Sequence, residues 1–186
     1  MCAMIRLYHF TSRYHLPSIF SEGLTRGDVP LSPDTQTQAV NLTSEGRFNK
    51  QHYNATSKFF HMGAFHPLDK TEVRITVDVD SSHRLLVPWI DLVSRYGTDK
   101  AWLQHLHRGG KTDGKEWFLF FGRIPPEDFA SVEFNSNGNG AWRKIDSPLS
   151  IAPVQDVRFT TSSKVEGYTI KSIPQDIFVA TYLSPP

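Results

Sequence analysis

The sequence contains one cysteine, Cys2, so no disulfide can form within the chain. Structural zinc sites built on cysteine pairs are excluded for the same reason. A cysteine this close to a terminus is also a poor candidate for a catalytic nucleophile. The near-absence of cysteine favours a reducing compartment.

Long apolar runs are missing as well. No stretch approaches the roughly 20 apolar residues of a membrane span, and the first ten residues, MCAMIRLYHF, lack the apolar core of a signal peptide. We therefore expect a soluble, cytoplasmic protein without a membrane partner.

Neither sign of charge prevails, since the chain has 20 Lys and Arg and 19 Asp and Glu and its net charge is +1. The basic residues are scattered, whereas domains built to bind nucleic acid usually carry a basic stripe. Dedicated nucleic-acid binding is therefore disfavoured, although a nucleic acid can still be a briefly held substrate.

Several common catalytic motifs are absent. The eight histidines form no HExxH pair, and we expect no metal, with most histidines packed or solvated. There is no GxSxG elbow, Walker loop or GxGxxG fingerprint, so common hydrolase, P-loop and Rossmann interpretations are weak.

A chain of 186 residues suits one domain. Hydrophobic alternation predicts strands, and 3.6-residue spacing with Pro and Gly at the ends predicts short helices. The predicted strands are 4–10, 39–43, 71–79, 115–124, 132–134, 157–160 and 168–173. The predicted helices are 16–23, 86–96, 99–106 and one turn at 127–130. Residues 25–38 are predicted as a loop, 135–140 as a glycine-rich loop, and 47–70 are ambiguous. The fold class expected is α+β.

Two segments are candidates for chemistry. His9 ends a predicted strand just before a turn, where its ring can lie in a cleft while the backbone of Phe10 binds a planar amide. The alternative is a packed histidine, with Thr11 or Ser12 capping the next helix. Glu116 opens a very apolar strand and is tuned for chemistry if it points inward. The alternative is an exposed glutamate paired with a lysine. Taken singly, each alternative is favoured.

Four segments in order resemble the ADP-ribosyltransferase family, in its branch of small bacterial and phage enzymes and ADP-ribosylating toxins. Leu7–Ser12 has the pattern of the first motif, an aromatic residue followed by His, any residue and Thr or Ser, and Leu16–Leu24 resembles the helix after it, which often ends in Glu-Gly-Leu. Ala39–Ser44 occupies the place of the second motif. Lys115–Phe118 and Gly122–Pro126 resemble the third motif, in which a Glu begins a strand that runs into an Ile-Pro turn. Together they span about two thirds of the chain.

The resemblance implies an α+β fold with a split antiparallel or mixed β-sheet and short helices around an NAD cleft. It implies a single domain over residues 1–186, with 141–186 either part of it or a C-terminal extension packed on it. NAD would be the co-substrate, and no metal is implied.

The resemblance also implies roles for individual residues. His9 would hydrogen-bond a ribose hydroxyl of NAD, the Phe10 backbone would hold the nicotinamide amide, and Thr11 would lie beside them. Glu116 would bind the 2′-hydroxyl of the nicotinamide ribose and stabilise the positive charge as nicotinamide leaves. A carboxylate beside the sugar suits such an oxocarbenium-like transition state, as in glycosidases.

The second motif departs from the family pattern, because an aromatic residue usually stacks on nicotinamide and this strand reads Asn41-Leu42-Thr43. Thr43 or Ser44 would take the polar part of that role. The stacking residue would be Phe48 or Tyr53. Arg47 is a candidate for pyrophosphate contact, with an exposed arginine as the alternative.

The activity expected is NAD-dependent mono-ADP-ribosyl transfer to a protein, a nucleic acid or a small molecule. An RNA 2′-phosphotransferase-like enzyme is an alternative, although those enzymes need a more basic cleft. A catalytically inactive NAD-binding or interaction domain is another, and the unusual second motif favours it. The acceptor and the role as toxin, phage counter-defence or housekeeping enzyme stay open, because they depend on loops.

Overall fold

The computed structural model describes residues 3–25, 27–47, 56–61, 64–69, 72–107, 113–135, 141–151 and 171–183, with the backbone alone for 56–61 and 64–69. The strands are β1 Met4–Thr11, β2 Asp28–Ser32, β3 Thr35–Gln38, β4 Val40–Thr43, β5 Thr56–His61, β6 Ala64–Asp69, β7 Val73–Asp80, β8 Leu86–Pro88, β9 Trp117–Phe120, β10 Phe129–Phe134, β11 Arg143–Lys144 and β12 Lys171–Ser172. The α-helices are α1 Leu16–Glu22, α2 Trp89–Tyr96, α3 Lys100–Leu106 and α4 Gln175–Phe178, and α4 continues into a π-helix, Val179–Leu183. Three 3₁₀ turns cover Arg13–His15, Pro126–Asp128 and Pro148–Ser150.

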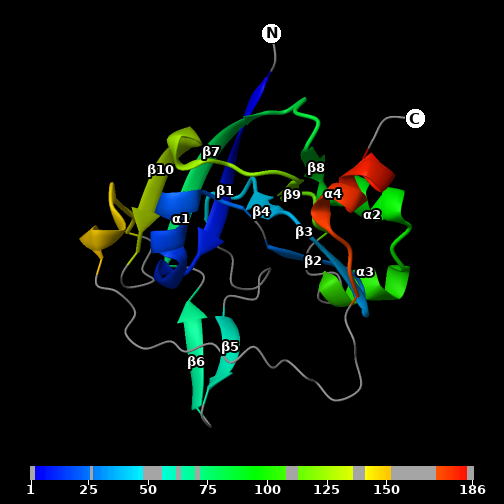
Figure 1. Cartoon of the computed structure of the whole chain (residues 1–186), viewed down its shortest axis with the longest axis horizontal. Helices are drawn as coiled ribbons and strands as arrows, with labels where there is room; N and C mark the ends of the chain where they lie inside the picture. The colour runs from blue at the N-terminus through cyan, green and yellow to red at the C-terminus, as the bar shows by residue number, and fades with distance from the viewer. Residues whose placement is uncertain are drawn as a thin grey trace.

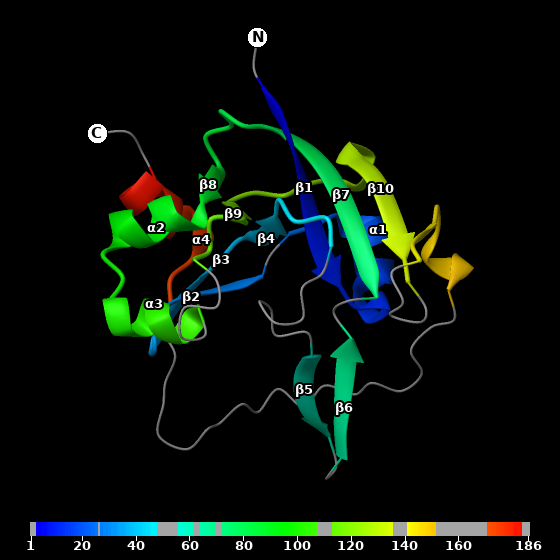
Figure 2. The ribbon, with the colours of Figure 1, turned by 180° about the vertical axis from the view of Figure 1, so that it is seen from behind.

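The principal sheet has the order β11-β10-β7-β1-β4-β9-β8, and its neighbouring strands are antiparallel. A smaller sheet, β12-β3-β2, includes a parallel pair, and β5 and β6 form a hairpin. Helix α1 lies over one face of the principal sheet (Figure 1), whereas no helix stands in front of β1 and β7 when the molecule is seen from behind (Figure 2). The fold is therefore mixed α+β, which confirms the class expected from the sequence.

The principal sheet consists of two well-paired groups joined by a weak seam. Strands β1 and β7 share eight register pairs, from Met4 with Asp80 to Thr11 with Val73. Strands β4 and β9 share four. Between the groups, β1 and β4 share one register pair, Tyr8 with Thr43. The sheet is continuous, and the junction between β1 and β4 has the fewest register pairs among the junctions within these two groups.

Two hydrophobic clusters stabilise the described part of the chain. The first lies between α1 and the sheet, where Leu7, Ile75 and Leu16 are at most 1% exposed. The second joins β2, β9, α2 and α4 around Phe178, which is fully buried. The segment after residue 141 contributes to both clusters, through Ile145 and Ile151 in the first and Phe178 in the second.

The structure confirms the predicted strands at β1, β4 and β7 and the predicted helices at α1 and α3. The prediction of a loop over 25–38 is wrong, because β2 and β3 pair there and bury Val29, Leu31 and Thr37. Threonine and glutamine on β3 hid the alternation that marks a strand. Residues 136–140, most of the predicted glycine-rich loop, and the predicted strand at 157–160 lie outside the described residues.

Two predicted elements are shorter than expected. The helix expected over 86–96 begins at Trp89, because Leu86–Pro88 pair with β9 as β8. The strand expected over 115–124 is limited to Trp117–Phe120. Lys115 and Glu116 belong to the turn before it. Phe121, directly after β9, donates its backbone N–H to the carbonyl oxygen of Leu85, directly before β8, at 2.8 Å.

Gly23 ends α1 with φ +80°, and a Cβ there would lie 2.2 Å from Ile124 O. This close approach lets Leu24 and Ile124 exchange two backbone hydrogen bonds of 2.9 Å. Gly97 is a matched control, because it has φ +73° with nothing within 4 Å of the same atom. We expect Gly97→Ala to lower the free energy of unfolding by about 1 kcal/mol and Gly23→Ala by about 2–3 kcal/mol, since only the latter adds a backbone collision to the strain. Equal losses in urea unfolding would contradict this.

Candidate functional site

Residues far apart in the sequence meet at the seam of the principal sheet. Thr43, at the end of β4, is paired with Tyr8 of β1 on one side and with Trp117 of β9 on the other. His9 follows Tyr8 directly, and Glu116 precedes Trp117 directly. Ser44 donates its backbone N–H to the carbonyl oxygen of Glu116 at 2.9 Å. The main chains of four predicted site residues, His9, Thr43, Ser44 and Glu116, therefore lie near the row formed by Tyr8, Thr43 and Trp117. Because side chains alternate along a strand, Thr43 lies on the face of Tyr8 and His9 on the opposite face.

His9 bridges the two sides of the seam. Its Nδ1 lies 2.8 Å from the carbonyl oxygen of Asn41 on β4. A carbonyl oxygen only accepts, so Nδ1 is the donor and carries a proton. In the neutral ring the lone pair is then on Nε2. The imidazole is half-buried and its tautomer is set by the backbone of the neighbouring strand.

The end of β1 continues into a buried polar junction. Ser12 is 1% exposed, caps the following 3₁₀ turn by accepting from Tyr14 N, and donates to Glu72 Oε1 at 3.0 Å. Glu72 also accepts from Arg13, through the backbone N–H at 2.7 Å and Nε at 2.9 Å. Ser12 is thus a capping residue, and Thr11 is buried at the end of the strand. Sequence reasoning missed Glu72, because its partners are about 60 residues away.

Glu116 is half-buried and lies in the turn that leads into β9. Gly114 has φ +72° in this turn and accepts a 3.1 Å hydrogen bond from Trp117 N. Lys115 pairs with Asp113 at 2.6 Å, and this hydrogen bond lowers the pKa of the Asp113 carboxyl. The neighbouring lysine is thus engaged by a different carboxylate.

Trp117 anchors the same turn against α2 and α3. Its ring lies edge-on to His107 with centroids 5.5 Å apart, and Trp89 Nε1 donates to His107 Nε2 at 2.9 Å. A Cβ on Gly114 would lie 2.6 Å from the ring of Trp89. The position of Glu116 is therefore set by close packing of Gly114 before it and Trp117 after it, and by the main chain of Ser44.

The segment after β4 carries the remaining predicted contacts. Glu45 N donates to Thr43 Oγ1 at 3.1 Å. Thr43 is buried, whereas Ser44 and Arg47 are exposed. Phe48 and Tyr53, the predicted stacking residues, lie outside the described residues.

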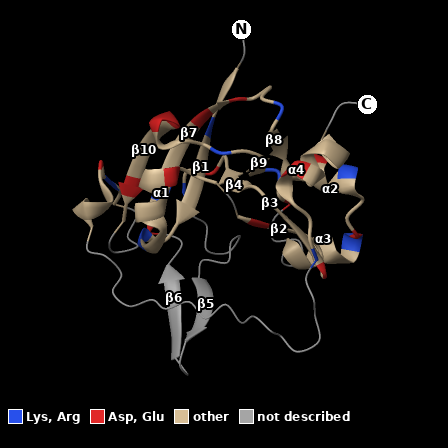
Figure 3. Ribbon diagram, viewed as in Figure 1, with Lys and Arg blue, Asp and Glu red and all other residues tan. Residues whose placement is uncertain are grey.

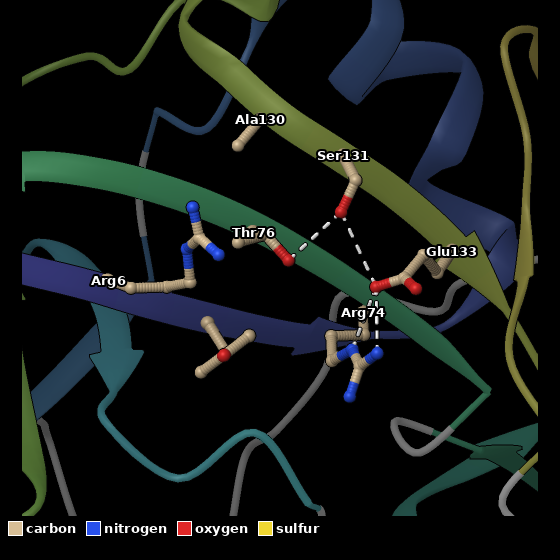
Figure 4. Close-up of a pocket in the computed structure, with 7 residues that line it drawn as sticks. Arg6, Arg74, Thr76, Ala130, Ser131 and Glu133 are labelled. Atoms are coloured by element: carbon tan, nitrogen blue, oxygen red, sulfur yellow. Dashed lines mark hydrogen bonds and ion pairs between the residues drawn. The ribbon is translucent and has the colours of Figure 1, made fainter.

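An open pocket of about 280 Å³ lies on the face of β1, β7 and β10 opposite Leu7 and α1. Its described lining residues do not include His9, Thr43 or Glu116, although Tyr8 joins it to the seam. Figure 4 shows the ion pair of Arg74 and Glu133 at one end and Arg6 at the other. The pocket is lined by Arg6, Tyr8, Arg74, Thr76, Ala130, Ser131 and Glu133.

The pair between Arg6 and Asp78 on this face gives a pH-dependent prediction. Two hydrogen bonds of 2.9 Å from Arg6 lower the pKa of Asp78. Because the folded-state pKa lies below the unfolded value of about 3.9, the stabilisation is complete above that value and is lost as the pH falls through the folded-state pKa. We expect the small difference in melting temperature between the wild type and Asp78→Asn to be constant near neutral pH and to vanish in acid. A difference that does not vary with pH in thermal melts would contradict this.

Among the described residues, no group of three or more His, Cys, Asp or Glu could hold a metal ion. Within the same part of the chain, no helix has the length and apolar character needed to cross a bilayer. Comparisons with protein-family models, curated proteins and solved structures gave no match.

Proposed function

We propose that the protein is an NAD-dependent mono-ADP-ribosyltransferase. One observation supports the proposal: where β1 and β4 share a single register pair, the main chain brings His9, Ser44 and Glu116 close to Thr43. The resemblance of the sequence places these residues in one NAD cleft.

The chemistry assigned to the site is substitution at C1′ of the nicotinamide ribose. The bond from C1′ to the nicotinamide nitrogen breaks and its electron pair leaves with nicotinamide. A lone pair of the acceptor then bonds to C1′, and the acceptor loses a proton. Glu116 would stabilise the positive charge that develops on the ribose. His9, oriented by the Asn41 carbonyl, would hold a ribose hydroxyl, and the Phe10 backbone would hold the amide of the leaving group.

The charge distribution favours this activity over an RNA 2′-phosphotransferase-like one. Figure 3 shows basic and acidic residues interspersed over the described elements, without a basic stripe. An enzyme that binds a phosphorylated RNA depends on such a stripe for affinity.

The proposal is tested by incubating the protein with NAD and measuring free nicotinamide by chromatography, together with a calorimetric titration of NAD. We expect saturable binding and release of nicotinamide above the rate in buffer. Binding without release would instead support an inactive NAD-binding domain. No binding at millimolar NAD would contradict the assignment of the cleft.

A further inference from the structure

Arg74 of β7 has an unusual number of partners for a residue in the middle of a sheet. Nε and Nη2 each lie 2.9 Å from Oε2 of Glu133 on β10, and Nη1 donates to the carbonyl oxygen of Gly46 in the segment after β4. All three guanidinium nitrogens are thus engaged, and the side chain is 17% exposed. A planar guanidinium presents donors in several directions at once, which an ammonium group cannot do in the same geometry.

Two aromatic rings enclose the same guanidinium. Its Cζ lies 4.5 Å from the ring centroid of Trp142 and 5.5 Å from that of Tyr8. Trp142 in turn lies 6.2 Å from Phe10. Cation–π contacts strengthen when the cation is partly desolvated, as it is here. Arg74 therefore holds together β1, β7, β10 and the segment before β11.

The bond to Gly46 is the contact that reaches the candidate site. Gly46 packs on the Tyr8 ring so closely that a Cβ would lie 3.1 Å from it. Gly46 stands between Ser44 and Arg47, both assigned to the NAD cleft. The bond crosses from the β1–β7–β10 side of the seam to the chain leaving β4, where β1 and β4 share a single register pair.

We propose that Arg74 is a positioning residue that holds residues 44–47 against β1 and thereby sets the geometry of Ser44 and Arg47 for the co-substrate. This inference rests on the proposed function for its effect on NAD. The clamping of the 44–47 segment is a property of the protein alone and is measured separately.

The clamp is tested by trypsin under native conditions, because Arg47 is exposed and provides a cleavage site in the clamped segment. We expect Arg74→Ala to increase the rate of cleavage after Arg47 about tenfold, since cleavage follows the population of the opened segment. The matched control is Arg6→Ala, which removes another arginine from the same pocket without touching the segment. A rate after Arg47 that is equal in wild type and Arg74→Ala would overturn the clamp.

Chemical rescue distinguishes the clamp from general destabilisation. The carboxylate of Glu133, the carbonyl of Gly46 and the rings of Tyr8 and Trp142 form a site for a guanidinium ion. We expect methylguanidinium, far below denaturing concentrations, to restore protection of Arg47 in Arg74→Ala, and methylammonium to fail. Equal effects of the two cations would overturn the proposal. If Arg74→Ala does not fold by circular dichroism, Arg74→Lys takes its place, and we expect it to be cleaved after Arg47 faster than the wild type because an ammonium cannot bind Glu133 and Gly46 in the same geometry. Cleavage of Arg74→Lys at the wild-type rate would then overturn the clamp.

The effect on the site is tested by nicotinamide release. We expect the KM for NAD to rise about tenfold in Arg74→Ala with kcat nearly unchanged, because contacts of the bound ground state are lost. An unchanged KM beside faster cleavage after Arg47 would overturn the role in positioning the co-substrate. If the wild type neither binds nor cleaves NAD, the proposed function fails, while cleavage and rescue still decide the clamp.

Discussion

Glu116→Gln is expected to lower the rate of nicotinamide release from NAD by about 100- to 1,000-fold, the usual effect of removing one preorganised group that stabilises transition-state charge. Glutamine keeps the shape of the side chain and removes its negative charge. Gly114, the packing of Trp117 and main-chain hydrogen bonds support the turn, and the substitution leaves all of them in place. The loss should therefore appear in kcat, with binding of NAD changed much less.

The measurement compares initial rates of nicotinamide release for the wild type, Glu116→Gln and Glu127→Gln. Glu127 is exposed in the 3₁₀ turn before β10 and is the matched control for the loss of one charge. Calorimetric titration of Glu116→Gln with NAD shows whether the cleft is intact. Equal release by the wild type and Glu116→Gln would remove Glu116 from the catalytic assignment.

Several strands and helix ends around this site could be predicted from the local sequence pattern. The alternation of Val73, Ile75 and Val77 predicts β7, and Gly23 predicts the end of α1. Both signals are short-range consequences of strand pleat and of a left-handed backbone. The order of His9, Thr43 and Glu116 along the chain also let the resemblance place them together. The fold class followed from such signals, whereas the residues of the candidate site followed from the resemblance.

The contacts that orient these residues could not be predicted, because they depend on the tertiary arrangement. Nothing local marks the Asn41 carbonyl as the partner of His9, and Arg74 on β7 reads as an ordinary solvent-facing residue of an alternating strand. Its partners Gly46 and Glu133 lie 28 and 59 residues away. The wrong prediction of a loop over residues 25–38 has the same origin. Packing against α2 and α4 buries β2 and β3, and their own sequence shows no strong strand pattern.

Glu72→Gln is expected to lower the free energy of unfolding by about 2–3 kcal/mol, less than the usual loss on breaking a fully buried ion pair because Arg13 is 34% exposed. Glu72 is 8% exposed and accepts from the Ser12 hydroxyl and twice from Arg13. An amide offers one acceptor oxygen, so one of these donors would face the NH₂ group instead. Asn135 N donates to Glu72 O, so this main-chain link between β7 and β10 should remain.

The loss corresponds to a fall in melting temperature of roughly 5–10 °C for a chain of this size. Glu22→Gln, an exposed change in α1, is the matched control and should leave the melting temperature within about 1 °C. Ser12→Ala removes one donor to Glu72 and the cap on Tyr14 N, and should cost about 1–2 kcal/mol. If Glu72→Gln has the same melting temperature as Glu22→Gln, the polar junction of Ser12, Arg13 and Glu72 does not stabilise the end of β1. If it melts early but the folded fraction releases nicotinamide at the wild-type rate, Glu72 stabilises the strand that carries His9 without tuning its chemistry.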